Sequence, residues 1–182
     1  MRDRPEAAPR LAAVVFERDE EPEPPVLAFL AAAAQTGARV AGLVQETPPE
    51  AVRRRDLRVR DLATGETLPI MQDLGQEASG CAVDPAAIAE AARLLRRAIA
   101  TGPDLLIVNR FGRLEAEGGG MLADIANAFE AGIALLVCLP VRYLGAWNAF
   151  AGGLDVQLPP NREAIEAWWA TVVGDKASRE SA

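Results

Sequence analysis

The sequence predicts a three-layer α/β domain in which a mainly parallel sheet of about five strands carries helices on both faces. Short apolar runs alternate with helix-favouring stretches at both ends of the chain, and these runs hold few polar residues, as strands buried on both faces do. A strand, a helix and a second strand in close succession favour a right-handed crossover and parallel pairing. The 182 residues fit one such domain.

The first βαβ unit covers the N-terminal part of the chain. We expect a strand over residues 11–16, a helix over 26–36 that ends at Gly37, and a strand over 39–44. Residues 57–71 then alternate apolar and polar side chains around Gly65, which predicts a β-hairpin inserted at the sheet edge or projecting as a flap.

The second half repeats the α/β pattern. Asp84 and Pro85 are typical of a helix start, and the helix is expected to run to residue 100. The remaining predicted elements are strands at 104–108 and 133–138 with a helix at 121–130 between them, a helix at 143–150, a short strand near Val156 and a helix at 162–173. The domain is expected to span 11–174, with a flexible N-terminus at 1–10 and a disordered tail at 175–182.

Composition excludes several kinds of function. The formal net charge is −7, which disfavours nucleic acid as a partner. The basic residues 53–55, 58 and 60 are the local exception and are typical of a solvated loop and strand edge. With no histidine, neither a Ser-His-Asp nor a Cys-His catalytic arrangement can form. Two cysteines and no spanning apolar run predict a cytoplasmic protein without a membrane association.

Ligands of parallel sheets bind outside the carboxyl ends of the strands, which here selects the loops after Phe16, Val44, Val108 and Cys138. The first of these loops, residues 17–25, has five carboxylates and three prolines but neither glycine nor lysine. A phosphate-binding loop reads Gly, four residues, Gly, Lys and Ser or Thr, so this loop is expected to repel a polyphosphate. It is either a solvated acidic loop or a ligand set for Mg²⁺ or Ca²⁺.

The loop after Val108 is the best candidate for an anion site, because arginines supply charge and glycines before a helix allow close backbone approach. The expected contacts are Asn109, Arg110, Gly112, Arg113, Gly118, Gly119 and Gly120, with Gln45 and Arg142 as secondary contacts. The alternative is that the glycines only form a flexible turn. Glu115 is the nearby carboxylate for a base or a metal ligand, or else it forms a surface salt bridge.

The sequence also suggests roles for its cysteines and for several aromatic residues. Cys81 precedes a helix and is either a reactive thiol or a small buried residue. Cys138, Trp147 and Phe150 are expected to fill the core. Adjacent Trp168 and Trp169 cannot share one helix face, so one faces a partner or a homodimer interface unless the helix is packed on two sides.

The residues from Asp104 to Gly118, Asp-Leu-Leu-Ile-Val-Asn-Arg-Phe-Gly-Arg-Leu-Glu-Ala-Glu-Gly, resemble a bacterial family of uncharacterised proteins. Members are often labelled nucleoside-triphosphatase or molybdenum-transporter ATP-binding protein. Residues 41–45, 72–75, 80–81 and 84–85 fit the same family. That family is distantly similar to the archaeal-type nucleoside triphosphatases of the P-loop class.

The resemblance implies a P-loop-NTPase-like fold with degenerate motifs. It puts Asn109 at the magnesium-holding Asp and Arg110 at the catalytic Glu, while Gly112 and Glu115 match. Asn lacks the charge that holds magnesium, and Arg cannot act as a base. Three hypotheses follow: a protein that binds a small anion such as molybdate or a nucleotide fragment, a divergent Mg-dependent nucleoside triphosphatase, or a protein-interaction module without a small ligand.

Overall fold

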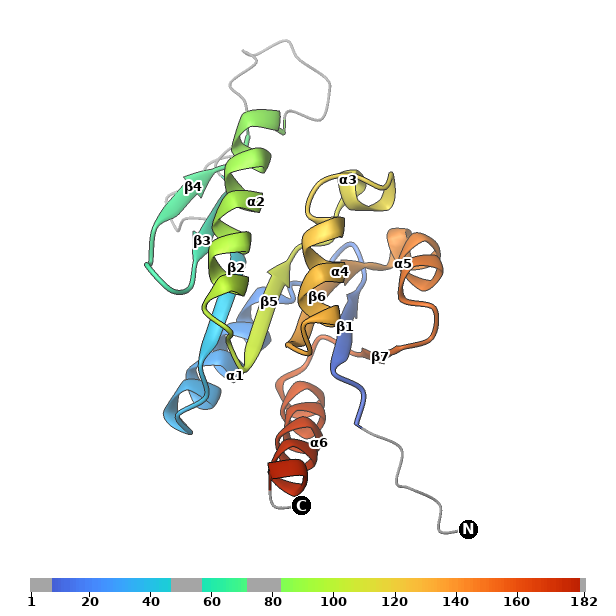
Figure 1. The fold of residues 1–182 in the computed structure, drawn as a ribbon. Helices are drawn as coiled ribbons and strands as arrows, with labels where there is room; N and C mark the ends of the chain where they lie inside the picture. Colours follow the sequence, from blue (N-terminus) through green and yellow to red (C-terminus); the bar gives the residue numbers. More distant parts are fainter. Residues whose placement is uncertain (1–7, 47–56, 72–82, 181–182) are drawn as a thin grey trace.

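A computed structural model describes residues 8–46, 57–71 and 83–180 of the chain. They form a seven-stranded sheet with the strand order β4-β3-β2-β5-β6-β1-β7 (Figure 1). The strands are β1 Leu11–Phe16, β2 Val40–Glu46, β3 Arg58–Asp61, β4 Thr67–Pro69, β5 Leu105–Asn109, β6 Ala134–Pro140 and β7 Asp155–Leu158.

The five strands of the predicted parallel sheet are confirmed, and the sheet is larger because the hairpin joins it. Strands β2, β5, β6, β1 and β7 pair in parallel. The hairpin strand β3 pairs antiparallel with β2, and β4 forms the edge, so the insertion extends the sheet instead of projecting as a flap. The central strands β5 and β6 are fully buried, which explains their unbroken apolar sequences.

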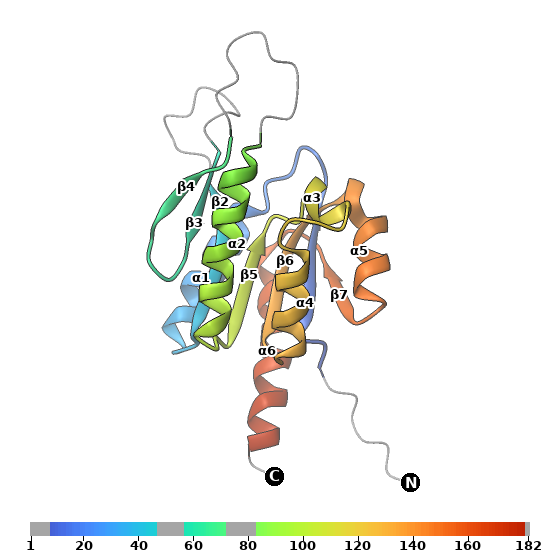
Figure 2. The ribbon, with the colours of Figure 1, turned by 45° about the horizontal axis from the view of Figure 1, so that its top comes forward.

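Helices cover both faces of this sheet, as predicted. Alternate strand residues divide the core in two, because successive side chains point to opposite faces. One face packs against α2, α4 and α5, and the other packs against α1 and α6 (Figures 1 and 2). The helices are α1 Glu23–Gln35, α2 Pro85–Ala100, α3 Arg113–Ala116, α4 Leu122–Glu130, α5 Leu144–Ala151, which follows the 3-10 turn Val141–Tyr143, and α6 Arg162–Glu180.

The crossovers diverge at the carboxyl ends of two neighbouring strands. After β1 the chain runs through α1 on one face to β2, whereas after β6 it runs through α5 on the opposite face to β7. The neighbours β1 and β6 therefore form a topological switch point, where ligands of open α/β sheets bind. In Figure 1 the arrowheads of β5 and β6 point toward the end of the molecule where α3 lies.

Helix α1, the loop after β5 and the C-terminal tail differ from the sequence prediction. Helix α1 begins at Glu23 because Pro24 and Pro25 are compatible with a first helical turn. A short helix, α3, forms in the predicted glycine-rich loop. The tail predicted to be disordered from residue 175 is helical to Glu180, since α6 extends from a packed start and Lys176 pairs with Asp104.

Two further predictions concern the N-terminus and membrane association. Within the predicted flexible N-terminus, Trp168 Nε1 donates to the carbonyl of Pro9, and Arg10 donates to the carbonyl of Gly132. Residues 1–7 and 181–182 lie outside the described part of the chain. Among the described residues, no helix combines the length and the hydropathy that crossing a membrane requires.

Candidate functional site

A three-residue polar cluster lies at the carboxyl edge of the sheet. Glu23 Oε1 accepts hydrogen bonds from Arg110 Nε at 3.0 Å, Arg110 Nη2 at 2.9 Å and Asn109 Nδ2 at 3.3 Å. The side chains of Glu23 and Arg110 are 17% and 30% exposed. This partial shielding from water makes the ion pair stronger than a fully exposed one. The cluster joins the start of α1 to the end of β5.

Packing beneath the cluster orients the guanidinium. Arg110 Cζ lies 4.9 Å from the centre of the Phe16 ring. Phe16 is the last residue of β1 and is buried. The N–H of Phe111 donates to the carbonyl of Cys138 and ties the loop after β5 to β6. The peptide bond between Asn109 and Arg110 is cis. The Arg110 head group is therefore held between an aromatic face and a carboxylate.

Asn109 has one amide atom without a partner. The residue is 2% exposed, and its side-chain Oδ1 is buried with no hydrogen bond to the described residues. The neighbouring Glu23 carboxylate selects this amide orientation, because the reverse would place two oxygens face to face. A buried acceptor without a donor costs free energy, so the site offers one hydrogen bond to a donating group such as water.

The acidic loop after β1 has its own local order. Glu20 Oε2 accepts the N–H of Glu17 at 2.7 Å, which closes the loop on itself. Pro24 and Pro25 occupy the first turn of α1, where they supply no N–H groups for a ligand. Glu23, the last of the five carboxylates in this loop, is the one that reaches Asn109 and Arg110. This role was not predicted, because the sequence placed Glu23 in the loop and the helix start at residue 26.

Glu115 organises the loop between β5 and α4. Its carboxylate accepts the N–H of Gly112 at 2.9 Å and the N–H of Met121 at 3.0 Å, and the residue is 5% exposed. Gly120, with φ of +56°, lies against the same carboxylate. Both carboxylate oxygens are thus occupied by backbone donors. Glu115 is therefore buried within its own loop and does not form the alternative surface salt bridge, while its role as a base or metal ligand stays a prediction.

The remaining residues of the predicted anion site make other contacts. Arg113 pairs with Glu117 along α3 at 2.7 Å, and its side chain is largely exposed. Arg142 lies 4.9 Å over the Tyr143 ring. Gln45 is half-buried near the end of β2. Gly118, Gly119 and Gly120 lie in the turn next to Glu115, and their role as anion contacts stays a prediction.

The predictions for metal binding, thiols and tryptophans have mixed outcomes. Across residues 8–46, 57–71 and 83–180, no group of three or more acidic or cysteine residues is placed to hold a metal ion. Burial, and next the charge of Glu23, raise the pKa of the Cys138 thiol well above its usual range, so this residue is inert core as predicted. Trp168 and Trp169 are both buried, and both belong to the core between the sheet, α1 and α6. Cys81 and the basic residues 53–55 lie outside the described residues.

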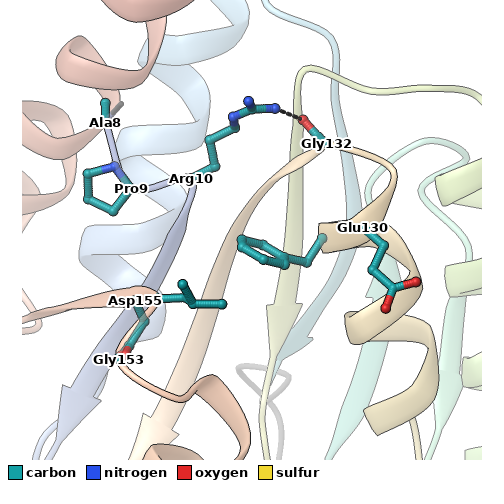
Figure 3. Close-up of a pocket in the computed structure, with 9 residues that line it drawn as sticks. Ala8, Pro9, Arg10, Glu130, Gly132, Gly153 and Asp155 are labelled. Atoms are coloured by element: carbon teal, nitrogen blue, oxygen red, sulfur yellow. Dashed lines mark hydrogen bonds between the residues drawn. The ribbon is translucent and has the colours of Figure 1, made fainter. Parts of the chain in front are cut away.

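A separate pocket lies at the opposite, amino edge of the sheet. It is lined by residues near the starts of β1, β6 and β7, among them Arg10, Gly132 and Asp155 (Figure 3). Arg10 turns toward Gly132 and donates to its carbonyl, as the dashed line in Figure 3 shows. None of the sequence-predicted site residues lines this pocket. The predicted anion site and the pocket are therefore at different ends of the strands.

Comparisons with known proteins support this architecture. Residues 11–168 match the family described as "Protein of unknown function (DUF2478)". A curated relative from Bradyrhizobium diazoefficiens, named "Molybdenum import ATP-binding protein ModC 2", is 33% identical over 161 residues. The match covers 88% of this chain but 18% of that protein, so the chain spans about a fifth of its length.

Two solved structures share the fold. A human cancer-related nucleoside triphosphatase has a TM-score of 0.60 at 13% identity, covering 82% of this chain and 88% of that one. THEP1 from Aquifex aeolicus has a TM-score of 0.54 at 14% identity, covering 83% and 91%. These findings confirm the resemblance drawn from the sequence and the P-loop-NTPase-like fold.

Proposed function

Because the chain belongs to the DUF2478 family and has a P-loop-NTPase-like fold, we propose that it binds a small oxyanion at the carboxyl edge of its sheet. The observation that carries the proposal is the convergence of Arg110 and Asn109 on one carboxylate oxygen of Glu23. The folded chain thus holds two donor side chains around one negative charge. An oxyanion that takes the place of this carboxylate meets the same donors.

Molybdate is the oxyanion that the comparisons favour. The curated relative is named for molybdenum import, and molybdate is a tetrahedral dianion that suits a guanidinium fork. The buried, unpaired Oδ1 of Asn109 adds an acceptor for a water or a protonated oxygen carried by the anion. We propose a role in molybdenum metabolism, in which the protein signals or stores the anion without hydrolysing a nucleotide.

The rival function is magnesium-dependent nucleoside triphosphate hydrolysis. Two features argue against it: the sequence resemblance puts Asn109 where a carboxylate would hold magnesium, and the Glu115 carboxylate accepts two backbone N–H groups. Pro24 and Pro25 at the start of α1 withhold donors that would cradle phosphates. We expect phosphate release from ATP or GTP with Mg²⁺ to equal that of buffer. A magnesium-dependent rate above buffer would favour the rival.

Thermal unfolding tests the binding proposal. Molybdate, tungstate, sulfate, and ATP with Mg²⁺ are added in turn at increasing concentration, and a ligand of the folded state raises the melting temperature by mass action. We expect molybdate and tungstate to raise it, and Arg110→Ala to abolish the rise. Arg93→Ala is the matched control, because Arg93 also pairs with a glutamate but lies exposed on α2. No response to any anion, or an equal loss in both variants, contradicts the proposal.

A further inference from the structure

We infer that Glu23 is a tethered competitor for the Arg110 site, so that it sets both the affinity of the site and the charge of the anions that it accepts. The inference rests on the proposed function and deepens it. Glu23 and Arg110 are 87 residues apart in sequence, yet their side chains meet at 2.9 Å. The carboxylate is part of the chain, so its local concentration does not depend on the amount of protein or ligand in solution.

The contact geometry resembles that of a bound anion. All three donors point to the same oxygen, Glu23 Oε1, and the guanidinium presents both Nε and Nη2 to it. The Phe16 ring contacts the Arg110 head group independently of the carboxylate. Removal of the carboxylate therefore leaves the guanidinium with one of its two contacts, so the site remains formed for an external anion.

A tethered group competes through its local concentration. The fold holds the Glu23 carboxylate beside Arg110, which makes their contact intramolecular, so an external anion must compete with it. The apparent affinity for the external anion equals the intrinsic affinity multiplied by the fraction of molecules in which Glu23 has left the site. When it leaves, the side chain can reach solvent, because it starts 17% exposed. The affinity measured for the wild-type protein is thus the intrinsic affinity lowered by this opening step.

The competition also selects by charge. A monoanion such as nitrate replaces one unit of negative charge with another, and it gains nothing over a carboxylate that is already in place. A dianion such as molybdate brings twice the charge to Arg110 and meets the same donors with more oxygens. The structure thus favours tetrahedral dianions over monoanions, and the preference depends on the charge of Glu23.

Glu23→Gln tests the inference, because glutamine keeps the size of the side chain and removes its charge. The neutral amide can still accept a hydrogen bond from the Arg110 guanidinium, but it loses the attraction between opposite charges, so the glutamine releases Arg110 more readily. By calorimetry with sodium molybdate and sodium nitrate, we expect molybdate to bind about tenfold more tightly than to wild type, and nitrate binding to become measurable. Glu90→Gln, which removes the carboxylate paired with Arg93 on α2, is the control and should change neither affinity.

The outcomes separate this inference from the proposed function. Equal molybdate affinity in wild type and Glu23→Gln overturns the competitor while leaving oxyanion binding intact. No binding to either protein overturns both. If Glu23→Gln is unstable, its melting temperature with molybdate supplies the readout. The inference requires a larger rise than in wild type, and an equal or smaller rise contradicts it. Glu23→Asp, which keeps the charge on a shorter side chain, should bind nitrate no better than wild type.

Discussion

Gly120 lies directly against the carboxylate of Glu115, so closely that a β-carbon at residue 120 would collide with Glu115 Oε1. That oxygen accepts the N–H of Met121, and Oε2 accepts the N–H of Gly112. One buried carboxylate thus fastens both ends of the loop that joins β5 to α4. The glycine is needed here for contact as well as for its positive φ.

Gly120→Ala should lower the free energy of unfolding by roughly 2–4 kcal/mol, since backbone strain and displacement of the Glu115 carboxylate add together. The measurement is chemical denaturation of purified protein. Gly118→Ala is the control, because Gly118 also has a positive φ of 87°, but a β-carbon there would meet no atom within 4 Å. Gly118→Ala should lower the free energy of unfolding by about 1 kcal/mol. Equal losses of stability in the two variants would contradict a collision between a β-carbon at residue 120 and Glu115.

Glu115→Gln should destabilise the protein by roughly 1–3 kcal/mol, because an amide has a single oxygen and leaves one of the two backbone N–H groups without an acceptor. Thermal or urea unfolding measures the change. Glu117→Gln, just beyond the same short helix, should change the stability by less than about 0.5 kcal/mol, since the Glu117 side chain is 57% exposed. A loss as small as this at Glu115 would show that its buried hydrogen bonds contribute little.

Gly42→Ala should be among the most damaging single substitutions in the sheet. Gly42 lies in β2 with φ of +116°, and a β-carbon there would overlap the backbone of Ile107 in β5. Backbone atoms of a central strand cannot move aside, so we expect a loss of roughly 3 kcal/mol or more, or no soluble protein. Gly37→Ala has a positive φ but open surroundings and should lose about 1 kcal/mol. Similar melting temperatures for the two variants would contradict this expectation.

Asp104 should make the stability depend on pH in acid. Burial acts to raise the pKa of this carboxyl, but hydrogen bonds from Lys176 and Arg39 outweigh burial and hold the pKa below its ordinary value of 3.8. The unfolded chain therefore binds the proton more readily than the folded chain. The stabilisation is present above pH 3.8 and is lost as the pH falls from there toward the lower folded value.

Asp104→Asn removes this titration, so its unfolding free energy should fall less than that of wild type between about pH 6 and about pH 3. Lys176→Met keeps the carboxyl but removes one donor, and its pH dependence should lie between the two. The measurement is urea denaturation across this range. If Asp104→Asn and wild type show the same change in unfolding free energy with pH, then the Lys176 and Arg39 contacts do not lower the pKa of Asp104 in the folded state.

Local sequence patterns are sufficient to predict most of the elements. The apolar runs of β1, β5 and β6 are recognisable because strands buried on both faces exclude polar side chains. The start of α2 is predicted at the observed residue, because Asp84 caps the helix through the N–H of Ala86 and Pro85 fits its first turn. The hairpin at 57–71 is likewise visible from alternation around Gly65.

The candidate site is predictable only in part. The carboxyl-edge rule identifies Asn109 and Arg110, which the structure brings together. It also identifies Arg113 and Arg142, which contact Glu117 and Tyr143 instead. The partner that the sequence does not reveal is Glu23, one of five carboxylates in an acidic loop. Nothing local distinguishes it from its acidic neighbours, because its role depends on which carboxylate the start of α1 presents to β5.

The sequence by itself determined the α/β class, the order of the elements and the absence of histidine chemistry, because these depend on periodicity, helix-end residues and residue type. The tertiary structure decided that Glu23 meets Arg110 and that Glu115 serves its own loop. Such contacts depend on strand order and on side-chain direction, which fix distances between residues far apart in the chain. A composition or a motif does not contain those distances.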